Sequence, residues 1–342
     1  MEDFVMGECE MIILGIETSC DETAAAVLRD GRVVLSDVIY SQIDIHKEYG
    51  GVVPEIASRN HLDKISPCVD EALALAGVGF SDLDAIGVTY GAGLVGALLV
   101  GVCYAKGLSL ALERPLIAVN HIQGHICSNY VCHEELEPPF LCLVASGGHT
   151  TLAIVKSYTE YEIIGQTVDD AAGEAYDKVA RTLGLSYPGG PIVDKLAQTG
   201  TASIAFPRAF MGDDNFNFSF SGLKSAVLNY VNKQKARGGC VNVPDVCASF
   251  QEAVSDVLCK KTISAAKKYG IKKIAAAGGA SANSLLRAEL AFLCEDNGFE
   301  LYLPSLRLCT DNAVMIAARA YFDFRANKYS DMSLNAVPNL RL

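Results

Sequence analysis

Two histidines four residues apart are the side chains of this sequence best suited to chemistry. Residues 115–119 are typical of a strand, and Asn120 is a good N-cap for a helix that would begin at His121. On that helix His121 and His125 lie on one face, one turn apart, so both imidazoles can bind one metal ion at about 2 Å. The alternative is that both are hydrogen-bonded polar residues of a half-buried helix.

A carboxylate that could complete such a metal site lies far along the chain. Asp311 stands in a polar turn, residues 309–313, which opens a final apolar helix. Two histidines and a carboxylate with open coordination positions suit Fe(II) or Zn(II). We therefore predict one divalent metal ion per subunit, with Fe(II) favoured and Zn(II) as the alternative.

Two short polar turns between predicted strands are candidates for phosphate binding. The first, residues 17–23, carries carboxylates and hydroxyls of the kind that reach a phosphate through a metal ion or water, namely Glu17, Ser19 and Asp21. The second, residues 146–150, contains Gly147 and Gly148, which let backbone N–H groups approach an anion. Each turn could also be an ordinary polar hairpin.

Further polar residues follow predicted turns in the second half of the chain. Asp177 lies on a predicted helix, and the rigid turn 188–191 leads to Asp194. These carboxylates suit either the hydroxyls of a ribose or the capping of a helix, and the sequence leaves both open. Asn283 follows two glycines after a strand, where a nucleotide base can rest on the backbone and the amide can hydrogen-bond it.

These residues are positioned by a succession of elements that occurs twice. A hairpin with a polar turn is followed by a helix, a strand, a glycine turn and another helix, first from residue 11 and again from residue 140. Such a repeat indicates two homologous α/β lobes that face each other. The predicted boundaries are a flexible extension over 1–10, a first lobe over 11–137 with the metal-binding helix, a second lobe over 138–330 with a polar insertion near 199–243, and a tail over 331–342.

Composition limits the partners and the compartment. The chain has 342 residues, half of them apolar, and a net charge of −12, which argues against a free-standing nucleic-acid binder. A tRNA or DNA substrate would need a helper subunit or local basic patches, such as a strip of lysines between 260 and 273. Twelve cysteines without a CxxC pair favour reduced thiols in a cytoplasmic protein. The apolar stretch 93–111 is interrupted by glycines and a lysine, which favours a buried helix over a membrane span.

Taken together, these segments closely resemble the universal tRNA threonylcarbamoyladenosine transferases, the TsaD-type proteins of bacteria, formerly described as O-sialoglycoprotein endopeptidases. The motifs that carry the resemblance are IETSCDET (16–23), YGGVVPEIASR (49–59), NHIQGH (120–125), SGGHT (146–150), DDAAGEAYDK (169–178), YPGGP (187–191), FSFSGLK (218–224), GGASAN (278–283) and TDNA (310–313). One departure is Ala92, which stands where the family usually has proline.

The resemblance implies a fold, a ligand set and a reaction. The fold would be the duplicated α/β fold of actin, Hsp70 and sugar kinases (the ASKHA fold), and the metal ligands would be His121, His125 and Asp311. The reaction would move an L-threonylcarbamoyl group from threonylcarbamoyl-AMP to the exocyclic amine of the adenosine beside the tRNA anticodon. The adenylate would be bound by Val144, Ala145, Ser146, Gly147, Gly148, Asp177, Gly190, Asp194 and Asn283.

The resemblance also implies partners. These are tRNA, a TsaB-type homologous subunit and a TsaE-type ATPase, with no membrane, and a Mg²⁺ ion could accompany a nucleotide. Two rival activities deserve comparison. A zinc protease of the HExxH type needs a glutamate after its first histidine, where this chain has Ile122. A sugar or acetate kinase shares the fold but would not need the histidine pair.

Overall fold

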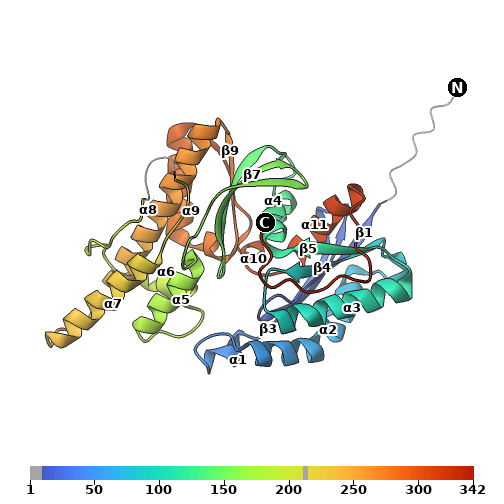
Figure 1. Ribbon diagram of the computed structural model, residues 1–342, viewed down its shortest axis with the longest axis horizontal. Coiled ribbons are helices and arrows are strands. Elements are labelled where there is room, and N and C mark those ends of the chain that lie inside the picture. Colours follow the sequence, from blue (N-terminus) through green and yellow to red (C-terminus); the bar gives the residue numbers. More distant parts are fainter. Residues whose placement is uncertain (1–9, 211–214) are drawn as a thin grey trace. The chain divides into compact units, whose positions relative to one another are not determined.

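The computed structural model describes residues 10–210 and 215–342 (Figure 1). The expected flexible extension, apart from Glu10, and the acidic pair Asp213–Asp214 of the expected insertion lie outside the described residues. The chain divides into two compact units. The first unit comprises Met1–Tyr40, Ser58–Gly124 and Asn312–Leu340, and the second comprises Ser41–Ala57, His125–Asp311 and Arg341–Leu342.

The first unit contains a mixed five-stranded sheet in the order β3-β2-β1-β4-β5. Strand β1 pairs antiparallel with β2 and parallel with β4, which in turn pairs parallel with β5. Strands β1 and β4 are almost fully buried, as expected for apolar strands inside a sheet that is covered on both faces. The strands are β1 Ile12–Glu17, β2 Glu22–Arg29, β3 Val33–Ser41, β4 Ala85–Gly91 and β5 Leu116–Asn120.

The sheet of the second unit repeats this topology strand for strand, in the order β10-β9-β6-β7-β8. Strand β6 pairs antiparallel with β7 and parallel with β9, and β9 pairs parallel with β10. The predicted duplication of an α/β lobe is therefore confirmed. The strands are β6 Phe140–Ala145, β7 Thr150–Ser157, β8 Glu160–Gln166, β9 Lys273–Ala277 and β10 Glu300–Tyr302.

Helix α11 near the C-terminus belongs to the first unit. It packs against β1 and β4 over two glycines, since a Cβ at Gly15 would lie 2.6 Å from the Ala317 nitrogen and one at Gly87 would lie 2.5 Å from the Ala320 Cβ. The second unit accordingly ends at Asp311 in its main segment, earlier than the expected residue 330. The helices that begin in residues 10–124 or lie after 311 are α1 Ile43–Lys47, α2 Pro54–Ala76, η1 Phe80–Asp82, α3 Val95–Leu112, α4 His121–Cys132 and α11 Val314–Arg325.

Helix α3 is the one helix in the described part of the chain with the length and composition to cross a membrane. This is weak support for a span, because core helices have the same composition. The helix packs against β4 in the first unit, and the Gly91–Ala92 peptide bond that precedes it is cis.

The segment 199–243 is less polar in its packing than the sequence led us to expect. Four of its phenylalanines, at 206, 216, 218 and 220, are buried in the core of the second unit, and its helix α7 packs on α5 and α8. Lys233, Lys235 and Arg237 of the segment are exposed, while the four buried phenylalanines anchor it. The helices of the second unit after α4 are α5 Ala172–Thr182, α6 Gly189–Ala197, α7 Ser221–Ala236, α8 Val243–Tyr269, η2 Gly279–Ala282, α9 Ser284–Asn297 and α10 Leu306–Cys309.

Candidate functional site

Helix α4 presents the histidine pair as predicted. The side chain of Asn120 caps it, because its Oδ1 accepts hydrogen bonds from the backbone N–H groups of Ile122 (2.9 Å) and Gln123 (3.2 Å). The helix lies close to α11 at Gly124, where a Cβ would come within 2.9 Å of Ile316. His121 is 7 % exposed and His125 is fully buried, so neither is an ordinary surface histidine.

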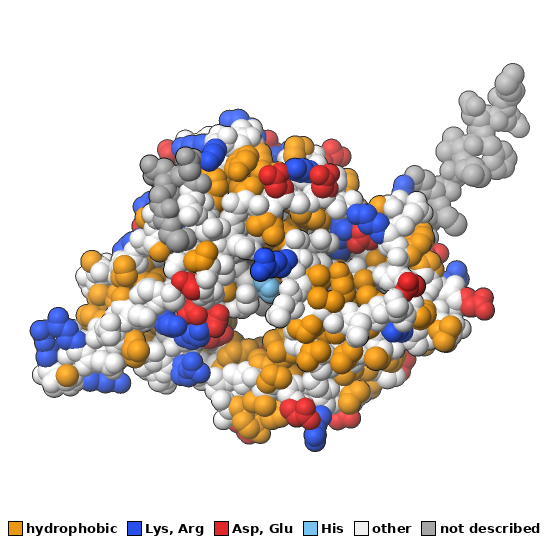
Figure 2. Space-filling view, viewed as in Figure 1, with side chains coloured by type: hydrophobic (Ala, Val, Ile, Leu, Met, Phe, Trp, Pro, Cys, Tyr) orange, Lys and Arg blue, Asp and Glu red, His pale blue; other side chains and the backbone are white. Residues whose placement is uncertain are grey.

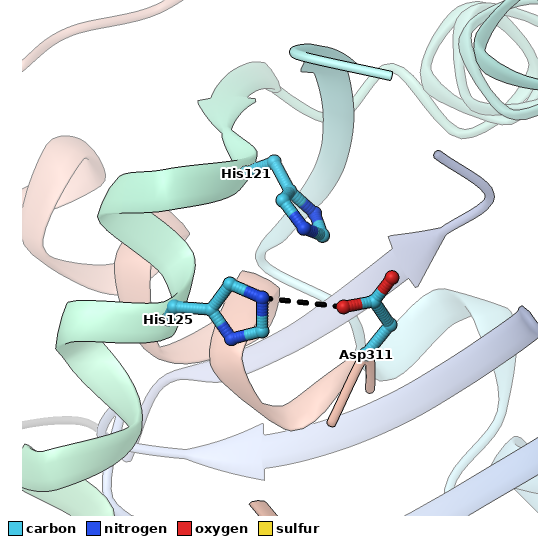
Figure 3. A group of neighbouring side chains, drawn as sticks. All are labelled: His121, His125 and Asp311. Carbon is cyan, nitrogen blue, oxygen red and sulfur yellow. Dashed lines mark ion pairs between the residues drawn. The ribbon is translucent and has the colours of Figure 1, made fainter. Parts of the chain in front are cut away.

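The three predicted metal ligands lie together. The Nε2 atom of His125 is 3.2 Å from Oδ1 of Asp311, and one ligand atom from each of His121, His125 and Asp311 lies within 4.8 Å of the others (Figure 3). His121 and His125 belong to one continuous helix, which holds one imidazole a single turn from the other.

A buried carboxylate orients the first of these histidines. Oε2 of Glu17 lies 3.0 Å from Nδ1 of His121 and accepts a 2.7 Å hydrogen bond from the Thr89 hydroxyl, while Oε1 accepts the N–H of Ser19. Glu17 is fully buried at the end of β1. A carboxylate on one ring nitrogen leaves Nε2 as the ligand atom and raises its basicity, as is usual behind metal-bound histidines.

The turn after β1 was expected to contact a phosphate, but its polar side chains point into the protein instead. Both carboxylate oxygens of Glu17 are engaged inside the protein, and the Ser19 hydroxyl lies 3.2 Å from Nδ1 of His121. Asp21 is buried as well, at 6 % exposure. The chemical type of Glu17 made it a phosphate-loop candidate, whereas its burial and its contact with a histidine 104 residues away place it behind the metal ligands.

The residues present fit a divalent metal ion. Two neutral imidazole nitrogens and one carboxylate oxygen form a donor set used by Fe(II) and Zn(II). The Glu17 carboxylate on Nδ1 of His121 is the kind of partner that orients a metal-binding histidine. The donor set does not select between the two metals.

The turn after β6 offers free backbone donors. Ser146 closes the turn, since its N–H donates to the His149 carbonyl (2.8 Å) and its Oγ accepts the His149 N–H (3.2 Å). Gly147 and Gly148 between them are exposed, and a Cβ built on either would meet nothing within 4 Å. Their N–H groups donate to no other group among the described residues. The preceding Val144 and Ala145 are buried in β6.

The first residues of helix α5 hydrogen-bond to this turn. The N–H of Gly173 donates to the Ser146 carbonyl (3.2 Å), and the N–H of Ala172 donates to the Thr150 hydroxyl (2.8 Å). A Cβ at Gly173 would lie 2.6 Å from the Ser146 oxygen and 2.8 Å from the Cα of Gly147. Only glycine allows the helix to approach the turn this closely. The contact with α5 therefore fixes the position of the exposed amides of Gly147 and Gly148.

Asp177 caps a helix, one of the two roles left open by the sequence. Its Oδ1 accepts the N–H of Gly189 (2.7 Å), the first residue of α6. The expected rigid turn 188–191 is therefore shorter than predicted, because the helix begins at Gly189 and contains Pro191 in its first turn, where proline is tolerated. Gly190 beside it has open space at its Cβ position.

Asp194 and Asn283 belong to one hydrogen-bond network. Asp194 accepts from the hydroxyl (2.6 Å) and N–H (3.1 Å) of Ser284, and Asn283 caps α9 by accepting the N–H of Leu286 (3.0 Å). The buried side chain of Gln251 on α8 joins the two. Sequence reasoning missed Gln251, because a polar residue in the middle of an amphipathic helix carries no local signal of a long-range contact.

A second acidic pair ties α5 to α7. Asp169 accepts hydrogen bonds from the backbone N–H groups of Phe220 (2.8 Å) and Ser221 (3.2 Å), at the start of α7. Partial burial raises the pKa of Asp169, but the hydrogen bonds of Ser219 and Ser221 outweigh it and leave that pKa below its usual range. Asp170 binds Lys178 and Lys224, each at 2.7 Å.

The lysines between 260 and 273, where the sequence suggested a local basic strip, differ in their surroundings. Lys261 is buried and donates to the carbonyls of Asn215 (3.0 Å) and Asn217, and Lys260 pairs with Asp256 at 2.6 Å. Lys268 and Lys272 lie over phenylalanine rings, with Nζ 5.3 and 5.4 Å from the ring centroids. Each of these cations therefore has a partner inside the second unit.

Comparison with known proteins identifies relatives by sequence and by fold. A tRNA N6-adenosine threonylcarbamoyltransferase of Clostridium perfringens (strain SM101 / Type A) is 59 % identical over 97 % of this chain and 98 % of its own length. Among solved structures, HypF of T. kodakarensis superposes with a TM-score of 0.62 at 14 % identity, covering 96 % of this chain and 49 % of HypF. The ROK hexokinase of Thermus thermophilus gives a TM-score of 0.50 at 15 % identity, covering 92 % of this chain and all of the hexokinase.

The two solved structures establish the fold alone, and it is the ASKHA fold predicted from the repeat and the motifs. The family is established by sequence. The model of the TsaD family, described as tRNA N6-adenosine threonylcarbamoyltransferase, matches residues 33–318. With the histidine pair and Asp311 in one cluster, this chain belongs to the TsaD family.

Proposed function

We propose that this enzyme transfers the L-threonylcarbamoyl group of threonylcarbamoyl-AMP to the exocyclic amine of the adenosine adjacent to the anticodon, in tRNAs that read codons beginning with A, and releases AMP. The family match and the 59 % identity to a relative of that name support the reaction class. The observation that carries the proposal is the cluster of His121, His125 and Asp311, with Glu17 behind it.

The chemistry requires positioning more than covalent catalysis. The donor is a mixed anhydride of a carbamic acid and a phosphate, so its carbamoyl carbon is already activated. The C–N bond to the tRNA amine forms, the C–O bond to the phosphate breaks, AMP leaves with the bonding electrons, and the proton lost by the amine passes to solvent. An enzyme that brings the amine within about 3–3.5 Å of the carbon can lower the barrier by about 7–11 kcal/mol, and no protein nucleophile is needed.

The metal would be held by His121, His125 and Asp311. The family is metal-dependent, and the donor set supports one divalent ion per subunit, with Fe(II) favoured and Zn(II) as the alternative. When bound, such an ion supplies Lewis acidity and a template for oxygen atoms of the threonylcarbamoyl group. Glu17 keeps the His121 ring in the orientation that this ligation needs.

The adenylate would be bound by the second unit. Two free N–H groups, at Gly147 and Gly148, suit the phosphate, and the buried Val144 and Ala145 fix the strand that carries them. The carboxyl ends of the parallel strands β6 and β9 lie side by side, which is the usual place for a nucleotide in an α/β sheet. Asn283 follows β9, and Asp177, Gly190 and Asp194 lie on α5 and α6, which come after β8; these four residues would hold the nucleoside. A Mg²⁺ ion could accompany the nucleotide.

The protease alternative lacks the glutamate that serves as general base in the HExxH motif. The residue after the first histidine is Ile122, and it is 1 % exposed. The nearby carboxylate of Glu17 is fully buried, and both of its oxygens are engaged by side-chain or backbone donors. A carboxylate in that position can orient a ligand but cannot activate a water. The kinase alternative has only the shared fold in its favour.

A candidate surface for tRNA phosphates is the end of α7. Residues 215–244 contain no aspartate or glutamate, although the whole chain has 40 of them. Lys233, Lys235 and Arg237 in this stretch are exposed, and Figure 2 shows basic side chains at the end of α7. Exposed cations without acidic neighbours are what a phosphate backbone requires, particularly in a chain with a charge of −12.

A partner subunit would cover the exposed apolar side chains of α2 and α3. Helices α2 and α3 carry large apolar side chains that are more than half exposed, and Figure 2 shows hydrophobic side chains gathered over α3; they are Leu62, Leu75, Val95 and Leu110. Exposed apolar residues on neighbouring helices are typical of a protein interface. We propose a TsaB-type homologous subunit as the partner there, with a TsaE-type ATPase in the same assembly.

The decisive experiment measures metal content and group transfer together. Labelled threonylcarbamoyl-AMP and unmodified tRNA are incubated with the purified protein, with and without the partner subunits. His121→Ala should lower bound metal and transfer in parallel. The matched control is His133→Ala, since His133 follows the same helix but bonds to the Leu303 carbonyl (2.9 Å). Wild-type transfer by a metal-free His121→Ala protein would overturn the proposal.

A further inference from the structure

Gln251 is a buried amide in the middle of the longest helix, α8, and both ends of its side chain are in use. The residue is 3 % exposed. Its Nε2 donates to Oδ1 of Asp194 on α6 (3.0 Å), and its Oε1 accepts from Nδ2 of Asn283 at the start of α9 (3.0 Å). One side chain thus connects two residues that the proposed function places on the nucleoside.

The contact between Asn283 and Leu286 determines which atom is donor and which is acceptor in each hydrogen bond of this network. Oδ1 of Asn283 accepts the backbone N–H of Leu286, so the Asn283 amide must turn its NH₂ group toward Gln251. Gln251 must then present its oxygen to Asn283 and its NH₂ group to Asp194. Among the common side chains of this length, only glutamine offers an acceptor at one atom and a donor at the other at neutral pH.

The network leaves capacity for a ligand at both ends. The Asn283 amide has two hydrogens, and Gln251 takes one of them. Oδ2 of Asp194 receives only the Ser284 N–H among the described donors, while Oδ1 receives both Gln251 and the Ser284 hydroxyl. The second amide hydrogen of Asn283 and the open lone pair of Asp194 Oδ2 point in fixed directions, because the other atoms of both side chains are held by hydrogen bonds.

We propose that Gln251 is a positioning residue of the adenylate site, which orients the Asp194 carboxylate and the Asn283 amide before the nucleoside binds. This inference rests on the proposed function. Orientation in advance lowers the cost of binding, so Gln251 should act on adenylate affinity and leave the transfer step unchanged. A merely structural role would instead change stability and both kinetic constants without regard to charge.

The substitution Gln251→Glu separates these roles, because it keeps the shape and replaces the donor by an acceptor. At neutral pH an ionised Glu would face Asp194, and one of the two carboxylates would have to turn away. Burial and the neighbouring negative charge raise the pKa of such a Glu, so acidification protonates it and restores a donor toward Asp194. The defect should therefore be reversible by lowering the pH.

Asp194 is the charged group that Gln251 contacts. Tyr176 from α5 lies near Asp194, and Cys247 lies one turn earlier on α8. Burial raises the pKa of Cys247 to about 11 and the pKa of Tyr176 above its usual range, so both groups stay neutral between pH 5.5 and pH 8. Neither group would therefore change the pH dependence of KM in that range.

The test measures KM for threonylcarbamoyl-AMP and kcat for transfer to tRNA, from about pH 8 to about pH 5.5. Gln251→Glu should raise KM roughly tenfold at pH 8, which corresponds to about 1.4 kcal/mol, at a nearly unchanged kcat. Relative to wild type at each pH, this defect should shrink toward pH 5.5. Gln251→Met should raise KM equally at every pH, and the control Glu252→Gln, an exposed neighbour paired with Arg208, should match wild type.

The outcomes separate the inference from the function on which it rests. A wild-type protein that neither binds threonylcarbamoyl-AMP nor transfers its acyl group removes the proposed function. Wild-type transfer together with an unchanged KM for Gln251→Glu, or a KM defect that ignores pH, overturns the role of Gln251 alone. If Gln251→Glu does not fold, Ser284→Ala decides, because it loosens Asp194 from the exposed side: a higher KM at constant kcat supports the inference, and an unchanged KM overturns it.

Discussion

The Oε2 atom of Glu17 lies 3.0 Å from Nδ1 of His121, in a site where the carboxylate is fully buried. Removing its charge should weaken the metal site without removing a ligand. We expect Glu17→Gln to lower metal affinity by roughly 10- to 100-fold, measured by competition with a chelator. Glu10→Gln, at an exposed ion pair with Arg29, is the matched control. Unchanged metal affinity in Glu17→Gln would show that the contact is only structural.

The approach of α5 to the turn proposed to bind phosphate, residues 146–150, can be tested with one methyl group. In Gly173→Ala the new Cβ would meet the Ser146 oxygen at 2.6 Å and push the turn outward. We expect adenylate binding to weaken by about tenfold to a hundredfold, as is typical for a small misplacement of binding groups. Gly222→Ala places the same methyl group in open space on α7 and should bind the adenylate normally. Calorimetric titration of both variants measures the difference.

Asp169 should contribute to stability in a way that depends on pH. Its hydrogen bonds to the start of α7 hold its pKa below the usual value, so its contribution is complete above the unfolded pKa of about 3.9 and is lost as the pH falls through the folded pKa. Asp169→Ala should cost about 1 kcal/mol at pH 7, as other helix caps do. The difference from wild type should shrink below about pH 4.

Urea unfolding at several pH values tests this expectation. Asp44→Ala, which removes an exposed ion pair with Lys47, is the control and should change stability little. A cost for Asp169→Ala that stays constant down to pH 3.5 would mean that the carboxylate charge is not what stabilises α7.

The basic end of α7 should be visible in the salt dependence of tRNA binding. Reversing Lys233, Lys235 and Arg237 to glutamate should weaken binding and reduce the slope of log K against log salt by about 2 to 3. The control reverses Arg29, Lys47 and Lys156, which are surface cations already paired with acids, and changes the net charge equally. Filter binding measures the tRNA affinity. An equal loss of affinity in both triple variants would show that net charge, and not the end of α7, causes the effect.

Much of the fold followed from local patterns in the sequence. The strands around residues 12–17 and 140–145 are apolar runs bounded by polar turns, and α4 begins where Asn120 can cap it. These signals act between near neighbours in the chain. The histidine pair likewise needed only the period of a helix. Its third ligand, Asp311, was identified by its turn and by the resemblance to the TsaD family.

The features that the sequence did not predict depend on contacts between distant residues. Glu17 meets a histidine 104 positions away, and Gln251 meets Asp194 across 57 positions, so neither pairing has a periodic signal. The start of α6 was hidden because its sequence, Gly-Gly-Pro, is typical of a turn. It becomes a helix because Asp177 of another helix accepts its first N–H.

The two sheets have one topology, yet their equivalent hairpin turns have acquired opposite electrical character. The turn after β1 directs a carboxylate inward, behind a histidine suited to a cation, whereas the turn after β6 exposes bare amides suited to an anion. The same hairpin position therefore suits a cation in one sheet and an anion in the other. Exchanging the two loops between the hairpins should keep both strand pairings and abolish both binding sites, because the backbone is shared while the charges are not.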